Sequence, residues 1–267
     1  MLIIGERINA TNKKVARAIR ERDSLFIQGM ASAQIAAGAD YLDVNAGAGG
    51  SGNEEDLMEW LVDTVQAVSN KALVIDSAEP KVVEAGLRRC QDRTAIINSI
   101  TAEPRRLEAL SPLVVDYDAE VIALAMDERG IPDSTEGRIN ACDRIAQRLT
   151  ALGIPLHKIL FDPMVLPIGV DSKVGITTLN TLEQIKSRYV QARTTLGLSN
   201  ISYGLPNREI INRMFLIMAM YAGLDSAIVD PLDSKLMNSI KVGEMLLGRD
   251  SFCKDYLAAH RRAQFKE

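Results

Sequence analysis

Histidine and cysteine are scarce in this chain of 267 residues. It has two histidines, His157 and His260, and three cysteines, Cys90, Cys142 and Cys253, which lie far apart with no C-x-x-C spacing. A zinc site or a disulfide framework needs such residues in closely spaced groups. We therefore expect reduced cysteines, no protein-bound metal and a cytoplasmic location, where thiols are kept reduced.

Long apolar runs and an excess of basic residues are also missing. No apolar stretch approaches the ~20 residues of a membrane span, and the apolar run at the N-terminus is too short for a signal peptide. The net charge of -4 and the pI of about 5.4 provide no basic surface that would attract nucleic acid or anionic lipid. We expect a soluble protein that binds neither nucleic acid nor membranes.

The sequence is rich in short apolar runs that alternate with longer segments of helical period, the pattern of βα units. The apolar runs predict strands at 2–5, 41–45, 72–76, 94–98, 120–125, 158–162, from Thr195 onward, and 226–230. The other segments predict helices at 13–37, 54–69, 81–90, 107–113, 135–151, 180–193, 209–221 and within 233–262. About eight such units predict an α/β fold, the (β/α)8 TIM barrel, with residues 1–267 as one domain. A doubly wound open sheet is the alternative, disfavoured because no G-x-G-x-x-G follows the first strand.

The segment 195–208 combines a short apolar run with a cluster of polar side chains, before a helical pattern resumes at Glu209. Polar groups at the end of a strand lie where α/β proteins place their chemistry. Apart from Arg208, the cluster contains no strong acid or base, and no serine or cysteine nucleophile is evident. These groups indicate a site that holds and polarises a neutral heterocycle by hydrogen bonding.

Carboxylates and carboxamides end most of the predicted strands. The residues are Asn9, Asp43, Asn45, Asp76, Asn98, Asp162, Asn200 and Asp230. In a parallel barrel these side chains converge at the C-terminal mouth. Together they can accept from ring N–H and exocyclic NH₂ groups and donate to a ring carbonyl, as the edge of a pterin or purine requires. Each one alone could instead cap the following helix or form an Asx-turn.

A set of short motifs connects these strand ends: Gly5-Glu6-Arg7-Ile8-Asn9, Leu42-Asp43-Val44-Asn45, Ile75-Asp76-Ser77, Ile97-Asn98-Ser99, Asp162-Pro163 and Gly197-Leu198-Ser199-Asn200-Ile201-Ser202, followed by Asn207-Arg208. Their order and spacing closely resemble the methyltetrahydrofolate:corrinoid protein methyltransferases, and more distantly the folate domain of cobalamin-dependent methionine synthase. The resemblance runs from Leu2 to about Leu247. It implies a pterin-binding (β/α)8 barrel, commonly a homodimer, that moves a methyl group between N5 of tetrahydrofolate and the cobalt of a separate corrinoid protein.

The resemblance also implies roles for individual residues. The residues implied to bind the pterin are Asp76, Asn98, Asp162, Gly197, Ser199, Arg208 and Ile228, the first three at its hydrogen-bonding edge. Asn200 is implied to reach N5 of tetrahydrofolate or 5-methyltetrahydrofolate, and so to be the catalytic residue. Further candidates for the site are Asn9, Asp43, Asn45 and Tyr203. The cobalt belongs to the corrinoid partner, so this chain itself would need no metal.

One position departs from the family. The acetogenic branch has a glutamine three residues after the asparagine of strand seven, whereas this chain has Tyr203, followed by Gly204-Leu205-Pro206. The change argues against a second amide contact to the pterin. It favours the catabolic branch, which feeds methyl groups released by demethylation into tetrahydrofolate.

Two other functions fit a pterin-binding barrel. A dihydropteroate synthase must also bind pyrophosphate and an arylamine, and the Lys and Arg residues of that family are missing from Ser199-Asn200-Ile201 and Asp230-Pro231-Leu232. A non-catalytic folate-binding subunit is the other alternative, and the presence of Asn200 argues against it. The cobalt spectrum of a corrinoid protein mixed with 5-methyltetrahydrofolate would distinguish all three.

Overall fold

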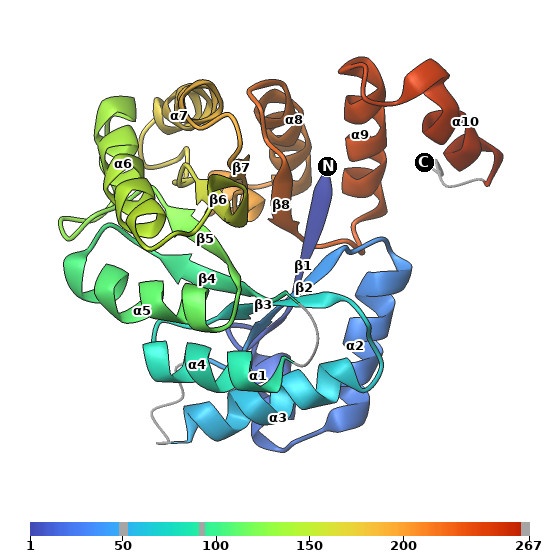
Figure 1. Ribbon diagram of the computed structural model, residues 1–267. Coiled ribbons are helices and arrows are strands. Elements are labelled where there is room, and N and C mark those ends of the chain that lie inside the picture. Colours follow the sequence, from blue (N-terminus) through green and yellow to red (C-terminus); the bar gives the residue numbers. More distant parts are fainter. Residues whose placement is uncertain (48–52, 91–93, 263–267) are drawn as a thin grey trace.

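The computed structural model describes residues 1–47, 53–90 and 94–262, which form a barrel of parallel strands surrounded by helices (Figure 1). The strands are β1 (Leu2–Asn9), β2 (Tyr41–Asn45), β3 (Ala72–Asp76), β4 (Ile96–Ile100), β5 (Glu120–Leu124), β6 (Ile159–Asp162), β7 (Arg193–Thr194) and β8 (Ser226–Val229). They pair in the order β7-β6-β5-β4-β3-β2-β1-β8. The predicted (β/α)8 barrel is confirmed, and the open-sheet alternative is wrong.

Helices connect successive strands and cover the outside of the barrel. They are α1 (Lys13–Arg20), α2 (Ser24–Ala36), α3 (Glu54–Gln66), α4 (Pro80–Arg89), α5 (Pro104–Asp116), α6 (Thr135–Ala151), α7 (Val174–Arg188), α8 (Arg208–Tyr221), α9 (Ser234–Leu246) and α10 (Lys254–Arg261). Short 3₁₀ turns lie at Leu156–Lys158, Leu198–Ser202 and Ser251–Cys253. Among the residues described, no helix is long and apolar enough to cross a lipid bilayer.

Each central strand is buried on both faces, as the continuous apolar runs predict. In β3, Leu73 and Ile75 join the large cluster between strands and helices. Val74 between them belongs to a smaller cluster that fills the barrel interior, with Ile4, Val74, Ile96, Ile122 and Leu160. Since side chains alternate across a strand, one apolar run supplies both layers. The packed interior leaves the polar strand ends as the place for a site.

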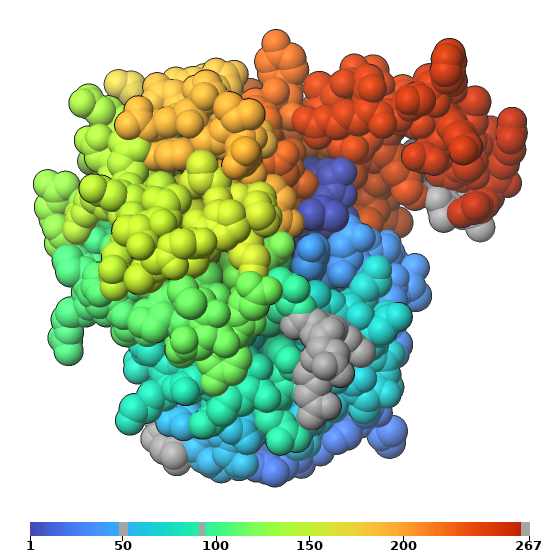
Figure 2. Space-filling model, viewed as in Figure 1, coloured from blue at the N-terminus to red at the C-terminus, as the bar shows by residue number. Residues whose placement is uncertain are grey.

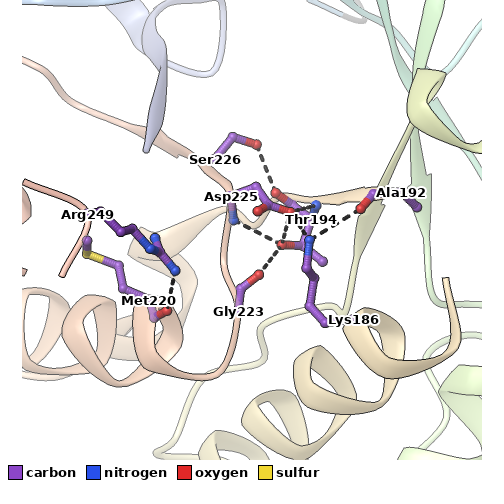
Figure 3. Close-up of polar contacts among 8 residues, drawn as sticks. All are labelled: Lys186, Ala192, Thr194, Met220, Gly223, Asp225, Ser226 and Arg249. Carbon is purple, nitrogen blue, oxygen red and sulfur yellow. Dashed lines mark hydrogen bonds and ion pairs between the residues drawn. The ribbon is translucent and has the colours of Figure 1, made fainter. Parts of the chain in front are cut away.

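The barrel closes between β7 and β8 with little strand pairing. An isolated bridge joins Gly197, three residues beyond β7, to Ile228 of β8, and side-chain contacts supply the other links. The Asp225 carboxylate accepts from the Thr194 N–H at 2.9 Å and pairs with Lys186 of α7 at 2.8 Å. The Ser226 hydroxyl donates to the Thr194 carbonyl at 3.0 Å. Figure 3 shows these contacts gathered around Thr194. They tie the short strand β7 to β8 and so hold the loop that follows β7.

The single helix predicted at 13–37 is wrong, because two helices, α1 and α2, occupy this range. Arg22 has a φ of 53°, which no α-helix accommodates. Asp23 then caps α2, its side chain accepting from the Phe26 N–H at 3.1 Å. The charged run between Arg20 and Ser24 therefore makes a turn and not a continuous helix.

The predicted positions of the sixth helix and the seventh strand are also wrong. Helix α7 starts at Val174 and ends at Arg188, not at 180–193. It ends because Tyr189 leaves helical geometry, its ring stacking on Phe161 with centroids 4.8 Å apart. Strand β7 consequently begins at Arg193 and ends before Thr195, where the apolar run suggested its start.

Three boundaries differ by a few residues. Strand β1 runs on to Asn9, β4 is shifted to Ile96–Ile100, and α5 extends over Pro104–Asp116, well beyond 107–113. Pro104 stands at the first turn of α5, where a missing N–H costs nothing. At the other end of the chain, α10 projects outward beyond α9, in red at the upper right of Figures 1 and 2.

Candidate functional site

A cavity of about 480 Å³ opens at the C-terminal ends of the strands. Its walls are formed by Glu6, Arg7, Asn9, Thr11, Asn12, Met30, Asp43, Asp76, Asn98, Ile228 and Asp230. The volume lies in the usual range of small-molecule sites. The walls are mainly polar, and five of the eleven residues, Asn9, Asp43, Asp76, Asn98 and Asp230, are strand-end residues expected from the sequence. The cavity therefore suits a flat, polar heterocycle.

Two carboxamide–carboxylate pairs form the wall contributed by β2, β3 and β4. The Asn98 amide donates to Asp43 at 3.1 Å, and the Asn45 amide donates to Asp76 at 2.8 Å. Burial raises the pKa of Asp43, and the neighbouring Asp76 charge raises it further. Burial likewise raises the pKa of Asp76, while the Asn45 hydrogen bond and Arg106 oppose this shift. This wall offers carboxyl oxygens to the N–H groups of a ligand.

Arg106 of α5 fixes the loops on either side of this wall, and the sequence offered no signal for it. Its guanidinium donates to the carbonyls of Ser99 at 2.6 and 2.9 Å, of Ser77 at 3.0 Å and of Ala78. The Ser77 and Ala78 carbonyls follow β3, and Ser99 is the next-to-last residue of β4. Arg106 therefore orders the chain just beyond Asp76, and its positive charge faces that carboxyl.

Asp162 ends β6 and lies outside the cavity walls, although the sequence grouped it with Asp76 and Asn98. Its side chain is 7% exposed. One oxygen accepts from the Met164 N–H at 2.7 Å, and the Gly197 N–H also bonds to this carboxyl. Burial raises the pKa of Asp162 to about 7, against the opposing effect of these N–H groups and of Arg138. Asp162 links the end of β6 to the loop after β7.

Arg138 of α6 is fully buried behind Asp162, a position that sequence reasoning missed because arginine is most often a surface residue. Its guanidinium donates to the carbonyls of Pro132, Pro163 and Met164 at 2.9, 2.9 and 2.8 Å, and to the Thr178 hydroxyl at 3.2 Å. Thr178 in turn donates to the Met164 carbonyl at 3.0 Å. Arg138 thus holds the segment after β6.

The loop after β7 is ordered by Arg208, the first residue of α8. Its guanidinium donates to the Ser199 carbonyl at 2.6 Å and the Ser202 hydroxyl at 3.0 Å, and lies 5.9 Å from the centre of the Tyr203 ring. Asn200 and Tyr203 are exposed, and neither lines the cavity. Within this loop Asn200 lies beside Gly197, where a Cβ would come within 3.3 Å of the Asn200 amide nitrogen.

Glu6 is the residue of this site that the sequence analysis left without a role. The predicted first strand ended at Gly5, but β1 continues past an irregularity between Gly5 and Ile8. The buried Gln34 side chain accepts from the Arg7 N–H at 3.0 Å, and a Cβ on Gly5 would lie 2.5 Å from the same oxygen. Because Gly5 has no Cβ, the Gln34 side chain can pack against it. The irregular strand then directs Glu6 into the cavity. A charged pair placed directly after an apolar run was the available signal.

In the described parts of the chain, no cluster of three or more His, Cys, Asp or Glu side chains is arranged to hold a metal ion. The cavity instead combines carboxyls with carboxamides. Such groups hydrogen-bond to a ring system with both donors and acceptors along its edge.

The sequence profile of the family described as pterin binding enzyme matches residues 5–230. The chain is 34% identical over 266 residues to the methylcorrinoid:tetrahydrofolate methyltransferase of Eubacterium limosum, covering 99% of this chain and 97% of that protein. It is 35% identical over 242 residues to the methionine synthase of Mycobacterium leprae, covering 86% of this chain and 20% of that much longer protein. Among solved structures, the dihydropteroate synthase of Xanthomonas albilineans superimposes with a TM-score of 0.67 at 19% identity, over 92% of each chain, which shows a shared fold.

Proposed function

Since this chain belongs to the family of pterin binding enzymes, we propose that it is a methyltransferase acting between a methylated corrinoid protein and tetrahydrofolate. The observation that carries the proposal is the 34% identity, over 99% of the chain, to a methylcorrinoid:tetrahydrofolate methyltransferase. The cavity is consistent with it, because its carboxyls and carboxamides suit a pterin.

In this proposal the pterin edge is held by Asp76 and Asn98, with Asp162 and Ser199 closing the slot beside Gly197 and Ile228. Asp43 and Asn45 support this edge, since each is paired with Asn98 or Asp76. Asn9 lines the outer part of the cavity. Arg208 acts through the loop that it orders.

Methyl transfer to N5 is a displacement at carbon, in which N5 uses its lone pair and then loses a proton. Asn200 is the proposed hydrogen-bond partner of N5. Its amide oxygen can accept from the N5 N–H, and after rotation of the amide its NH₂ group can donate to the N5 lone pair. The barrel supplies position and a mouth from which water is excluded when the corrinoid protein docks. The cobalt is the partner's, and no step requires a metal bound to this chain.

The experiment that tests the function is mixing the purified chain with a methylated corrinoid protein and tetrahydrofolate, and following the cobalt absorption spectrum. We expect loss of the methylcobalt spectrum with formation of 5-methyltetrahydrofolate. The direction proposed is toward tetrahydrofolate, as the name of the Eubacterium limosum relative describes for that protein. Tetrahydrofolate binding without any spectral change would support a non-catalytic subunit instead.

Replacing Asp76 or Asp162 by alanine should weaken tetrahydrofolate binding by about 1–3 kcal/mol each, the range for removing a buried hydrogen-bond partner. Isothermal titration calorimetry measures the change. Asp118→Ala is the matched control, because Asp118 is 90% exposed and pairs with Lys158 away from the mouth. Wild-type affinity in both variants, with lowered thermal stability, would make these residues structural caps only.

We also propose a homodimer, assembled through an apolar surface on α7, α8 and α9. This surface, the α7–α8–α9 face, is formed by Ile176, Met214, Met218, Tyr221 and Leu246, which are 52–78% exposed. Two mainly apolar hollows of about 520 and 400 Å³ lie in it and share Ile176 and Met218. Exposed apolar patches rich in Met and aromatic residues are typical of protein interfaces.

Placing a charge in the middle of the α7–α8–α9 face should separate the dimer. Met218→Glu is expected to give a monomer, since the buried carboxylate would have no partner across the interface. Analytical ultracentrifugation measures the mass. Val115→Glu on α5, at a side chain that is 48% exposed, is the control and should leave the mass unchanged. A wild-type protein that sediments as a monomer at micromolar concentration would rule the proposal out.

A further inference from the structure

Glu6 differs from the other carboxyls of the cavity in its partners. Asp43 and Asp76 each accept a hydrogen bond from a carboxamide. Within the described residues, the Glu6 side chain has one hydrogen bond, a long one of 3.4 Å from the Ser199 hydroxyl. A carboxyl that lines a ligand cavity and lacks strong partners is free to form a new hydrogen bond to the ligand.

The charged groups that act on Glu6 come from β1, β2, the end of β8 and the start of α8. Asp230 from the end of β8 and Asp43 from β2 are negative, and Arg7 and Arg208 are positive. Both cations are engaged elsewhere, because Arg7 pairs with Asp230 at 2.6 Å and Arg208 binds the loop after β7. No ion pair with Glu6 is therefore formed among these groups.

This environment makes the carboxyl a proton carrier at neutral pH. Burial raises the pKa of Glu6 to about 7, and the Asp230 charge adds to this effect. Ser199, Arg208 and Arg7 oppose it. A group whose pKa is close to the working pH is present in both forms, which is the condition for efficient general acid–base catalysis.

Ser199 connects Glu6 to the reacting end of the proposed substrate. It precedes Asn200, the proposed partner of N5, and its hydroxyl faces Glu6. The same cavity is lined by Asp43 and Asp76, the acceptors proposed for the pterin edge. Resting on the function proposed above, we propose that Glu6 exchanges the N5 proton with tetrahydrofolate, while Asn200 orients N5.

The exchange balances in both directions. Toward tetrahydrofolate, N5 attacks the methyl carbon, the cobalt–carbon bond breaks, and its electron pair stays on the cobalt of the corrinoid protein. The protonated N5 so formed gives its proton to the Glu6 carboxylate. In reverse, the Glu6 carboxylic acid protonates N5 of 5-methyltetrahydrofolate, and the reduced cobalt takes the methyl group from the nitrogen.

The test is the pH dependence of single-turnover methyl transfer, measured in both directions. Transfer to tetrahydrofolate releases a proton, so the ratio of forward to reverse rate constants rises about tenfold per pH unit by any route. If Glu6 carries the proton, the rate constant for methyl transfer to tetrahydrofolate rises with pH up to about 7 and is level above it. The reverse constant is level below that pH and falls above it.

Glu6→Gln keeps the shape of the side chain and an oxygen that accepts from the Ser199 hydroxyl, but the amide cannot carry the proton. In the plot of rate constant against pH, we expect the change of slope near neutral pH to disappear. Both rate constants should fall by about 10²-fold or more. The tetrahydrofolate affinity should stay within about threefold of wild type. Glu6→Asp should keep the change of slope near neutral pH, with lower rate constants. Glu21→Gln, just past the end of α1, at a carboxylate that is 58% exposed and pairs with Arg17, is the matched control and should behave as wild type.

A second readout does not depend on turnover. Infrared difference spectra of the folate-free protein should show a carboxylic acid that titrates at a pH of about 7 in the wild type and is missing from Glu6→Gln. The Asp162 carboxyl, with a similar pKa, remains in both. A carboxylic-acid absorbance that titrates near this pH with the same amplitude in Glu6→Gln as in the wild type would overturn the assignment.

The outcomes separate the two proposals. A wild-type chain that transfers no methyl group rejects the proposed function, and the role of Glu6 with it. If the wild type transfers the methyl group and Glu6→Gln keeps both the wild-type rate constants and the change of slope near neutral pH, only the proton exchange by Glu6 is rejected. Equal losses of affinity and rate would make Glu6 a binding residue and would also overturn the proposal.

Discussion

Asn200→Ala should lower the rate constant of methyl transfer by about 10²–10³, by analogy with the loss of other stabilising donors, while tetrahydrofolate affinity changes little. The reason is that charge at N5 changes most in the transition state, so a polar contact there contributes to rate more than to binding. Single-turnover kinetics with methylated and unmethylated folate measure the effect.

The position of Asn200 makes this test clean. Its side chain is exposed in the folate-free protein, next to the backbone of Gly197, and Arg208 holds the loop through other residues. Removing the amide should therefore cost little stability. Asn140→Ala on the exposed face of α6 is the matched control. Equal losses in affinity and rate constant, or unchanged turnover with lowered stability, would show that Asn200 does not have this role.

Arg138→Met should lower the free energy of unfolding by about 3–5 kcal/mol, the range for breaking a buried charged network by removing one partner. The methionine fills most of the space but leaves the carbonyls of Pro132, Pro163 and Met164 without their donor. It also removes the positive charge that faces Asp162. Urea unfolding followed by circular dichroism measures the loss.

Arg144→Met is the control for Arg138→Met, because it lies on the same helix but pairs at the surface with Glu128 at 3.1 Å. Exposed ion pairs contribute about 0–1 kcal/mol, so little change is expected. Arg138→Lys should fall between the two, since one ammonium cannot reach all four acceptors. A loss below about 1 kcal/mol for Arg138→Met would mean that water replaces the guanidinium at these carbonyls.

Where a residue's role follows from its own strand, the sequence predicted it well. Asp43, Asp76 and Asn98 each follow an apolar run, and parallel strands bring such ends to one edge. The structure places these side chains on one wall, where Asp43 accepts from the Asn98 amide and Asp76 from the Asn45 amide. Local pattern was sufficient here, because the barrel geometry converts position along a strand directly into position in space.

Two helix boundaries could not be predicted from the hydrophobic period of the sequence. The end of α7 is set by the Tyr189 ring stacking on Phe161, residues that the sequence separates widely. The break between α1 and α2 depends on a local turn at Arg22 that hydrophobic period does not report. The first boundary follows from packing and the second from the backbone conformation of one residue, and the periodic pattern reports neither.

The sequence by itself determined the strand and helix alternation, the barrel and the amide-rich mouth, because all of these follow from side-chain period and from residues at strand ends. Only the tertiary structure decided the roles of Glu6 and Arg138. Each depends on burial by segments far away in the chain, Glu6 on Ser199 and Asp230, and Arg138 on Pro163 and Thr178. Desolvation is a property of the assembled surroundings and not of the residue, so the raised pKa of Glu6 and the buried guanidinium become visible only when the chain is folded.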